Sequence, residues 1–188
     1  MIFDEVVFQL KDGRQAVLRS PREEDAQSVI RYLVQASGET EFLLRYPEEW
    51  AALTVEKEQA LLRQKREAPD TAMLMCLVDG QVIGNSEIAF LQGMKTRHRA
   101  RVAIAILKDY WGQGIGTRMF ERLIAAAQAR PEITQMELEF IEGNARARGL
   151  YEKMGFRIVG AHPDAIRLRS GETRNEYLMI KPLNRGKE

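Results

Sequence analysis

Seven residues, Trp111 to Thr117, constrain the fold more than any other stretch of the chain. They read Trp-Gly-Gln-Gly-Ile-Gly-Thr, and they follow an apolar segment, Val102 to Leu107. After them, apolar residues recur every three or four positions, which predicts a helix over about 114–129. The sequence therefore predicts a strand, a tight glycine turn, and a helix that begins inside the turn.

Such a turn is a candidate phosphate site. The first N–H groups of a helix have no partner within it and carry partial positive charge. Glycine at positions 112, 114 and 116 allows a ligand to approach these groups closely. Because a glycine inside a helix costs about 1 kcal/mol relative to alanine, three of them in five residues favour a binding role over a purely structural turn.

Two common phosphate-binding motifs fit this turn poorly. A Walker loop is excluded, because no lysine precedes Thr117. A dinucleotide fingerprint, G-x-G-x-x-G, fits Gly112 and Gly114 but has Thr117 where its last glycine should be. Glu137 or Glu139 could serve as its ribose-binding acid. An oxidoreductase that binds NAD(P) is therefore an open, weaker alternative.

Composition narrows the class of protein. The 188 residues, of which 45% are hydrophobic, predict a single domain over residues 1–188. A net charge of +1 gives no general attraction to nucleic acid or to an anionic membrane. Neither a membrane span nor a signal peptide is visible, and the single Cys76 excludes an internal disulfide, so we expect a cytoplasmic protein. His98 and His162 lack spaced metal-binding partners, so we expect no metal site.

The remaining pattern predicts a mixed α/β sheet rather than a regular βα alternation. A hairpin, 5–10 and 14–19, precedes a helix with Ser20 as its N-cap, and a loop runs from Gly38 to Trp50. The other expected elements are a helix over 54–67, strands over 73–78, 81–91 and 134–140, a helix from Asn144 to Met154, and closing strands over 156–160 and 174–181. Gly155 fits the left-handed position after the helix from Asn144, which predicts a Schellman ending with Phe156 against Tyr151. The strand at 134–140 alternates apolar residues with glutamates, which predicts one apolar and one acidic face.

Two separated motifs resemble the GNAT superfamily of acyl-CoA N-acyltransferases. The glycine turn is similar to its [RQ]-x-x-G-x-[GA] motif, except that Trp111 stands at the first position. Asn144 and the later stretch Leu-Tyr-Glu-Lys-Met-Gly-Phe, residues 150–156, resemble the family's N…A…LYEK.GF segment. The resemblance covers about Met73 to Leu183, and the first half matches only in the order of its elements.

The resemblance implies a central, mostly antiparallel sheet with one splayed parallel strand pair, flanked by about four helices. Acetyl-CoA would lie where the strands 102–107 and 134–140 separate. Ile104, Ala105 and Ile106 would contact its pantetheine, and the diphosphate would be bound by Gly112, Gln113, Gly114, Ile115, Gly116 and Thr117. Asn144 would cap its helix, contact pantetheine, or do both.

By the same resemblance, the chain would move an acetyl group from acetyl-CoA to a primary amine by direct attack in a ternary complex. Tyr151 would protonate the thiolate, because a phenol with a pKa of about 10 is protonated at neutral pH. Glu139 would be the base, with Glu87 or a water as alternatives, and the N–H of Ile106 would bind the oxyanion. A non-catalytic CoA-binding sensor is the main rival.

The acceptor amine cannot be read from the sequence. A small molecule and a protein N-terminus both fit, and a homodimer is expected only from the resemblance. An acidic stretch containing Glu39, Glu41, Glu48 and Glu49 would attract a cationic acceptor, although exposed loop charges explain it equally well. Arg118 and Arg146 are candidates for the cofactor's 3′-phosphate, and the basic stretch from Lys95 to Arg101 for its electrostatic steering.

Overall fold

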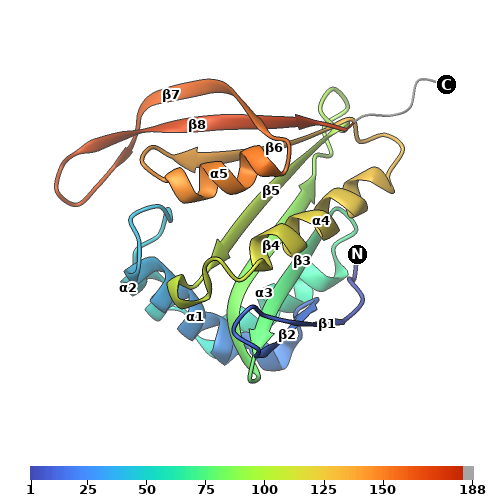
Figure 1. Ribbon diagram of the computed structural model, residues 1–188, viewed down its shortest axis with the longest axis vertical. Coiled ribbons are helices and arrows are strands. Elements are labelled where there is room, and N and C mark those ends of the chain that lie inside the picture. Colours follow the sequence, from blue (N-terminus) through green and yellow to red (C-terminus); the bar gives the residue numbers. More distant parts are fainter. Residues whose placement is uncertain (184–188) are drawn as a thin grey trace. The chain divides into compact units, whose positions relative to one another are not determined.

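The eight strands found among residues 1–183 form one sheet in the order β1-β2-β3-β4-β5-β6-β8-β7. This arrangement is taken from a computed structural model that describes residues 1–183 (Figure 1). The strands are β1 Val6–Gln9, β2 Gln15–Arg19, β3 Thr71–Val78, β4 Gln81–Phe90, β5 Arg99–Ile106, β6 Gln135–Ile141, β7 Arg157–Arg167 and β8 Thr173–Pro182. The helices are α1 Ala26–Gly38, α2 Pro47–Ala51, α3 Val55–Glu67, α4 Ile115–Gln128 and α5 Ala145–Lys153, with 3₁₀ turns η1 Glu23–Asp25 and η2 Lys108–Tyr110.

Most of the expected elements are confirmed. The pairs β1–β2, β2–β3, β6–β8 and β7–β8 are antiparallel, and β5–β6 is parallel, as the resemblance implied. The described residues contain five α-helices rather than about four, because the stretch expected to be a loop from Gly38 to Trp50 includes α2. Pro47 stands at the first position of α2, where its missing N–H costs no hydrogen bond.

The predicted start of the first helix is wrong. Ser20 is not its N-cap; its buried hydroxyl accepts a hydrogen bond from the N–H of Phe3 at 2.8 Å. Asp25 binds the N–H of Arg22 at 2.7 Å, and its carboxylate also forms a buried ion pair with Arg19. These contacts hold residues 23–25 as a 3₁₀ turn, so α1 begins at Ala26.

The chain divides into two compact units that are interleaved along the sequence. One contains residues 1–88 and 104–119, and the other contains residues 89–103 and 120 onwards. We describe each unit by itself.

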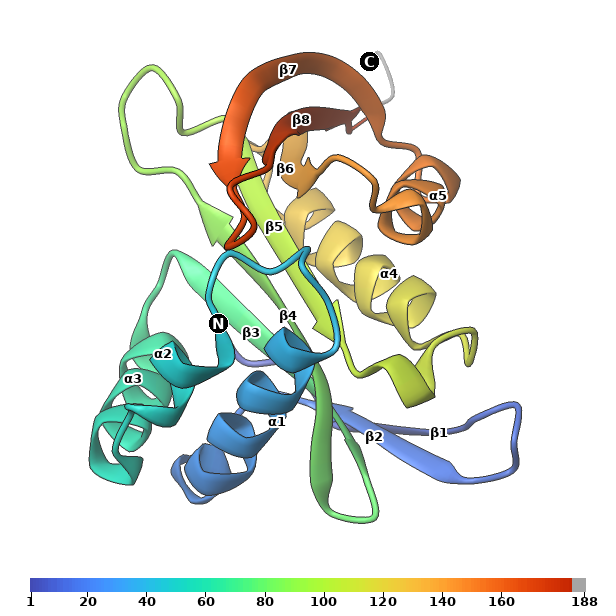
Figure 2. The ribbon, with the colours of Figure 1, turned by 90° about the vertical axis from the view of Figure 1, so that its left-hand side faces the viewer.

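In the first unit, α1 packs along β4 (Figure 2). The hydroxyl of Ser28 on α1 accepts a hydrogen bond from the N–H of Val82 at 3.0 Å. Val29, Ile30 and Tyr32 of α1 are buried, as is Leu62 of α3. The apolar periodicity of both helices thus buries one face of each against the strands.

In the second unit, β6 is the central strand. It pairs with β8 along all seven of its residues, from Gln135 to Ile141. Its parallel register with β5 covers three residue pairs, from Arg99 opposite Gln135 to Arg101 opposite Glu137. In Figure 1, β7, in orange, and β8, in red, run side by side as a long pair.

The two glutamates of β6 have different environments, which corrects the expected acidic face. Glu139 is exposed, but Glu137 is only 2% exposed. Arg99 reaches the Glu137 carboxylate at 2.6 Å, and Arg101 reaches it at 3.3 Å. Both arginines belong to β5, so the basic stretch expected as a loop ends in a strand.

No helix among residues 1–183 is long and apolar enough to cross a membrane.

We expect the free energy of unfolding to depend on Arg99 more than on Arg101. The Arg99 side chain is 30% exposed and lies closer to the buried carboxylate, whereas that of Arg101 is 55% exposed. Arg99→Met should lower the unfolding free energy by about 3 kcal/mol, because it removes the closer partner of a buried charge. Arg101→Met should cost less than about 1 kcal/mol. Urea unfolding measures both, and equal losses would contradict this assignment.

Candidate functional site

The glycine turn has the backbone conformation that its sequence predicts. Gly112 has a φ of +77° and Gly114 a φ of +85°, values that residues with a Cβ rarely adopt. The carbonyl of Gly114 accepts a hydrogen bond from the N–H of Arg118 at 3.2 Å, which closes the first turn of α4. The turn and the start of a fourteen-residue helix therefore coincide. This is the donor arrangement that suits a phosphate.

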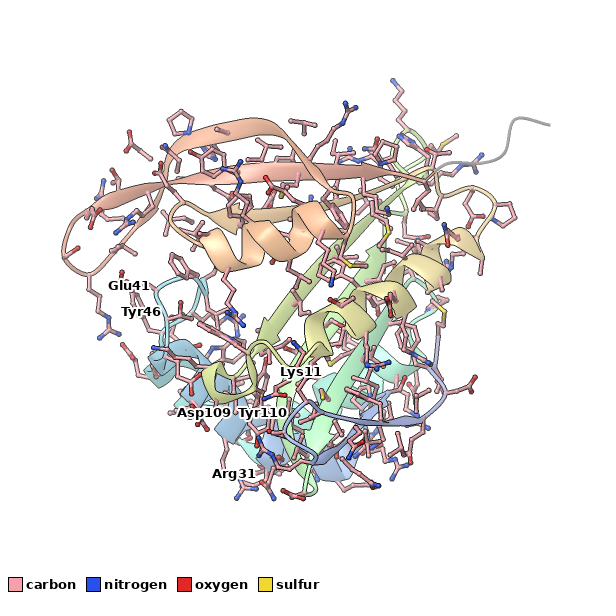
Figure 3. The ribbon with its side chains drawn as sticks, viewed as in Figure 1. Lys11, Arg31, Glu41, Tyr46, Asp109 and Tyr110 are labelled. Atoms are coloured by element: carbon pink, nitrogen blue, oxygen red, sulfur yellow. The ribbon has the colours of Figure 1, made fainter. Side chains whose placement is uncertain are left out.

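Side chains anchor this turn on both sides. The indole Nε1 of Trp111 donates to the carbonyl of Ile106 at 2.8 Å, which joins the turn to the last residue of β5. Oε1 of Gln113 accepts from the N–H of Lys11 at 3.0 Å, which joins it to the β1–β2 hairpin. Figure 3 labels Lys11 in the β1–β2 hairpin and Tyr110 in η2, the 3₁₀ turn before the glycine turn. Trp111, which departs from the family motif, therefore has a structural role, because it fixes the glycine turn to the end of β5.

The end of β5 is held by groups from several elements of the first unit. The carbonyl of Ala105 accepts a hydrogen bond from the hydroxyl of Tyr32 at 2.9 Å. The N–H of Leu107 donates to the carbonyl of Ile83 on β4 at 2.9 Å. Sequence reasoning missed Tyr32, because it lies 73 residues from its partner and its helix gave only a periodic apolar pattern.

Tyr151 lies in the aromatic core of the second unit. Its ring is 5.6 Å from that of Phe120 and 6.1 Å from that of Phe140, centroid to centroid. The N–H of Phe156 donates to the carbonyl of Tyr151 at 2.9 Å, and Gly155 has a φ of +86°, so the expected Schellman ending of α5 is confirmed. Burial raises the pKa of Tyr151 to about 12, so its phenol stays protonated at neutral pH.

Asn144 is the N-cap of α5, as expected. Its side-chain oxygen accepts a hydrogen bond from the N–H of Ala147 at 3.1 Å. This contact is sufficient to explain an asparagine at this position. Its second expected role, a contact with pantetheine, stays a prediction.

Glu139 lies near a second carboxylate. It is directly opposite Leu178 on β8, and Glu176 lies two residues before Leu178, on the same face of the sheet. His162 of β7 is directly opposite Glu176. Burial and then the charge of Glu139 raise the pKa of Glu176, while His162 and Arg101 oppose that shift. The sequence did not indicate Glu176 as part of this group.

Glu87 is engaged in an ion pair. Its carboxylate, on β4, accepts from Nζ of Lys65 on α3, and the two side chains are about one quarter exposed (24% and 27%). A base must have a free lone pair near the proton it removes. The pairing with Lys65 makes Glu87 a weaker candidate than Glu139.

Two of the other charged candidates, Arg118 and Glu39, have partners within the protein. The guanidinium of Arg118 lies over the ring of Phe8 at 4.8 Å, and Glu39 accepts from the N–H of Lys108 at 2.7 Å. Burial raises the pKa of Cys76 to about 12, which keeps it a thiol at neutral pH. Among residues 1–183, no three His, Cys, Asp or Glu side chains are grouped closely enough to hold a metal ion.

Comparisons of this chain with known proteins agree on one family. Residues 38–156 match the model of the Acetyltransferase (GNAT) family. Over 113 residues, 60% of this chain and 69% of the relative, the chain is 26% identical to an L-amino acid N-acetyltransferase, AaaT, of Escherichia coli K12.

Solved structures show the same fold. An acetyltransferase of the GNAT family from Streptococcus pneumoniae superimposes with a TM-score of 0.82 at 27% identity, over 89% of this chain and 99% of that one. The structure of yncA from Salmonella typhimurium, with its cofactor acetyl-CoA, gives 0.75 at 16% identity, over 92% and 96% of the two chains.

Proposed function

Because the chain belongs to the GNAT acetyltransferase family, we propose that it transfers the acetyl group of acetyl-CoA to a primary amine. The observation that carries this proposal is the glycine turn. Gly112 and Gly114 have left-handed backbone conformations, and the helix that follows begins with N–H groups directed outward from its first turn. These residues fit a diphosphate, because backbone N–H groups and a helix N-terminus both stabilise negative charge.

The first unit would bind the cofactor. The stretch from Gly112 to Thr117 would bind the diphosphate, and Ile104 to Ile106 would pair with the amides of pantetheine. A backbone group of β5 can pair with pantetheine only where no neighbouring strand already forms a hydrogen bond with it. The parallel register of β5 with β6 ends at Arg101, which supports this role for the later residues of the strand.

The second unit would supply the proton transfers. Glu139, exposed on β6, would accept a proton from the ammonium of the acceptor, directly or through a water. The neutral amine would attack the thioester carbonyl and form a tetrahedral intermediate. The attacking nitrogen would lose its extra proton to water, and collapse of the intermediate would form the amide and expel the thiolate of CoA. Tyr151 would donate its phenolic proton to that thiolate, since burial keeps the phenol protonated.

The acceptor belongs to the class of primary amines. The similarity to an L-amino acid N-acetyltransferase makes free amino acids the first compounds to test, followed by peptides with a free N-terminus. Release of the free CoA thiol measures turnover with each acceptor.

Calorimetry with acetyl-CoA tests the cofactor site. Gly114→Ala should raise Kd about fivefold or more, because a Cβ at this φ adds at least about 1 kcal/mol of backbone strain to the conformation that binds. Gly80→Ala is the matched control: Gly80 has a φ of +74°, lies in the β3–β4 turn, and, like Gly114, would place its Cβ with no atom within 4 Å. Equal Kd values for the two variants would contradict the assignment, and the absence of heat with the wild type would contradict the function.

Tyr151→Phe tests the acid. It should lower kcat about 100-fold and leave KM for acetyl-CoA nearly unchanged, because the phenol acts only as the thiolate leaves. Tyr177→Phe is the control, since that hydroxyl donates to Glu142 at 3.3 Å within the same unit. The pH profile of the wild type should lack an alkaline limb near the ordinary tyrosine value of about 10, because burial raises this pKa. An unchanged kcat in folded Tyr151→Phe would exclude the role.

The pH dependence of kcat/KM tests the base. A carboxylate base works only when ionised, so activity should fall on the acidic side as it becomes protonated. Glu139→Gln should lower kcat/KM at least about tenfold at neutral pH and remove this acidic limb. If Glu87→Gln removes the limb instead, the paired carboxylate of β4 is the base. A limb that persists in both variants would favour a water.

A further inference from the structure

Tyr32 is buried on α1 and has no part in the chemistry described above. The residue is 2% exposed, and its hydroxyl lies 2.9 Å from the carbonyl oxygen of Ala105 and 2.8 Å from Oδ1 of Asn85. Burial raises the pKa of this phenol above its usual value of about 10, so the hydroxyl remains a hydrogen-bond donor at any working pH.

The single proton of Tyr32 has a preferred acceptor. A phenol can donate one hydrogen bond, whereas an asparagine amide can donate or accept, depending on which end faces the hydroxyl. With Oδ1 of Asn85 toward Tyr32, two acceptors would compete for one proton. With the amide turned so that its NH₂ faces the hydroxyl, Asn85 donates to the phenolic oxygen and Tyr32 donates to Ala105. This arrangement satisfies all three groups, and polar groups in protein interiors are nearly always paired in this way.

The carbonyl that Tyr32 contacts belongs to the same peptide group as the N–H of Ile106, the expected donor to the oxyanion. In a trans peptide, the C=O of Ala105 and the N–H of Ile106 point in opposite directions, so this N–H points away from Tyr32. The groups that follow are also fixed: the carbonyl of Ile106 by Trp111, and the N–H of Leu107 by Ile83.

The strand β4 restricts the rotation of the same peptide group from another side. A Cβ on Gly84 would lie 3.1 Å from the oxygen of Ala105 and equally close to the side chain of Ile106. Glycine at this position therefore allows the close approach. The peptide between Ala105 and Ile106 has little freedom to rotate.

We propose that Tyr32 is a positioning residue for acetyl transfer. Its hydrogen bond to Ala105 orients and polarises the peptide so that the N–H of Ile106 stabilises the negative charge that forms on the thioester oxygen. This inference rests on the proposed function. Hydrogen bonds in series strengthen one another, and a donor already aligned needs no reorganisation when the charge develops. Tyr32 keeps its proton throughout, so no bond to it forms or breaks.

Infrared difference spectroscopy with acetyl-CoA labelled with ¹³C at its carbonyl tests the proposal. Bound to the wild-type protein, the carbonyl band should lie at lower wavenumber than in solution, because a hydrogen bond weakens the C=O bond. In Tyr32→Phe most of this shift should be lost. We expect kcat to fall about tenfold, a part of what a complete oxyanion donor supplies, while KM for acetyl-CoA changes less than about twofold.

Two further variants make the result decisive. Tyr177→Phe removes a hydroxyl from the other unit, and it should keep the wild-type band and kcat. Asn85→Asp places a carboxylate, which only accepts, next to Tyr32 and should take its proton from Ala105. It should therefore reproduce the loss seen in Tyr32→Phe although the tyrosine is present, even if Tyr32→Phe itself fails to fold.

A wild-type band position and kcat in folded Tyr32→Phe, or in Asn85→Asp, would overturn the proposal. A purely structural role would lower thermal stability without moving the carbonyl band, which also overturns it. Calorimetry distinguishes failure of the proposed function from failure of the role proposed for Tyr32. No binding of acetyl-CoA to the wild type would remove the proposed function and this inference together, whereas normal binding with an unaltered band would remove only the inference.

Discussion

Side chains donate hydrogen bonds to the carbonyl groups at the end of β5, and the candidate site in the first unit depends on these hydrogen bonds. Tyr32 binds the carbonyl of Ala105, and Trp111 binds that of Ile106. Because each carbonyl shares its peptide group with the N–H of the following residue, fixing the oxygen also fixes the direction of that N–H. Trp111 also directly precedes Gly112 in the sequence. Its side chain therefore links the part of the proposed site for pantetheine to the part for the diphosphate.

Features that depend on neighbouring residues could be predicted from the sequence. The glycine turn, the cap at Asn144 and the Schellman ending at Gly155 are each determined within a few residues, and all three are found. Their conformations require particular residue types, such as glycine at positive φ. This is why half of the candidate site, and the family resemblance, could be obtained before the fold was known.

Contacts between distant residues could not be predicted in this way. Glu137 and Glu139 have the same residue type and the same face of β6, and period-two alternation treats them alike. The difference arises from β5, whose arginines lie beside Glu137 only because the parallel register places Arg101 opposite it. The partners of Tyr32 and Glu87 are equally invisible, since 73 and 22 residues separate them.

The tryptophan at the first position of the glycine motif changes how negative charge is bound there. An arginine at this position would offer a full positive charge, while the indole donates to the protein's own backbone at Ile106. Arg118, the next cation along the helix, lies over the ring of Phe8. The diphosphate would then be held mainly by backbone N–H groups, whose direction is set by geometry rather than by mobile side chains. Such binding depends on the conformations of Gly112 and Gly114 and therefore on the contacts that anchor this turn through Trp111 and Gln113.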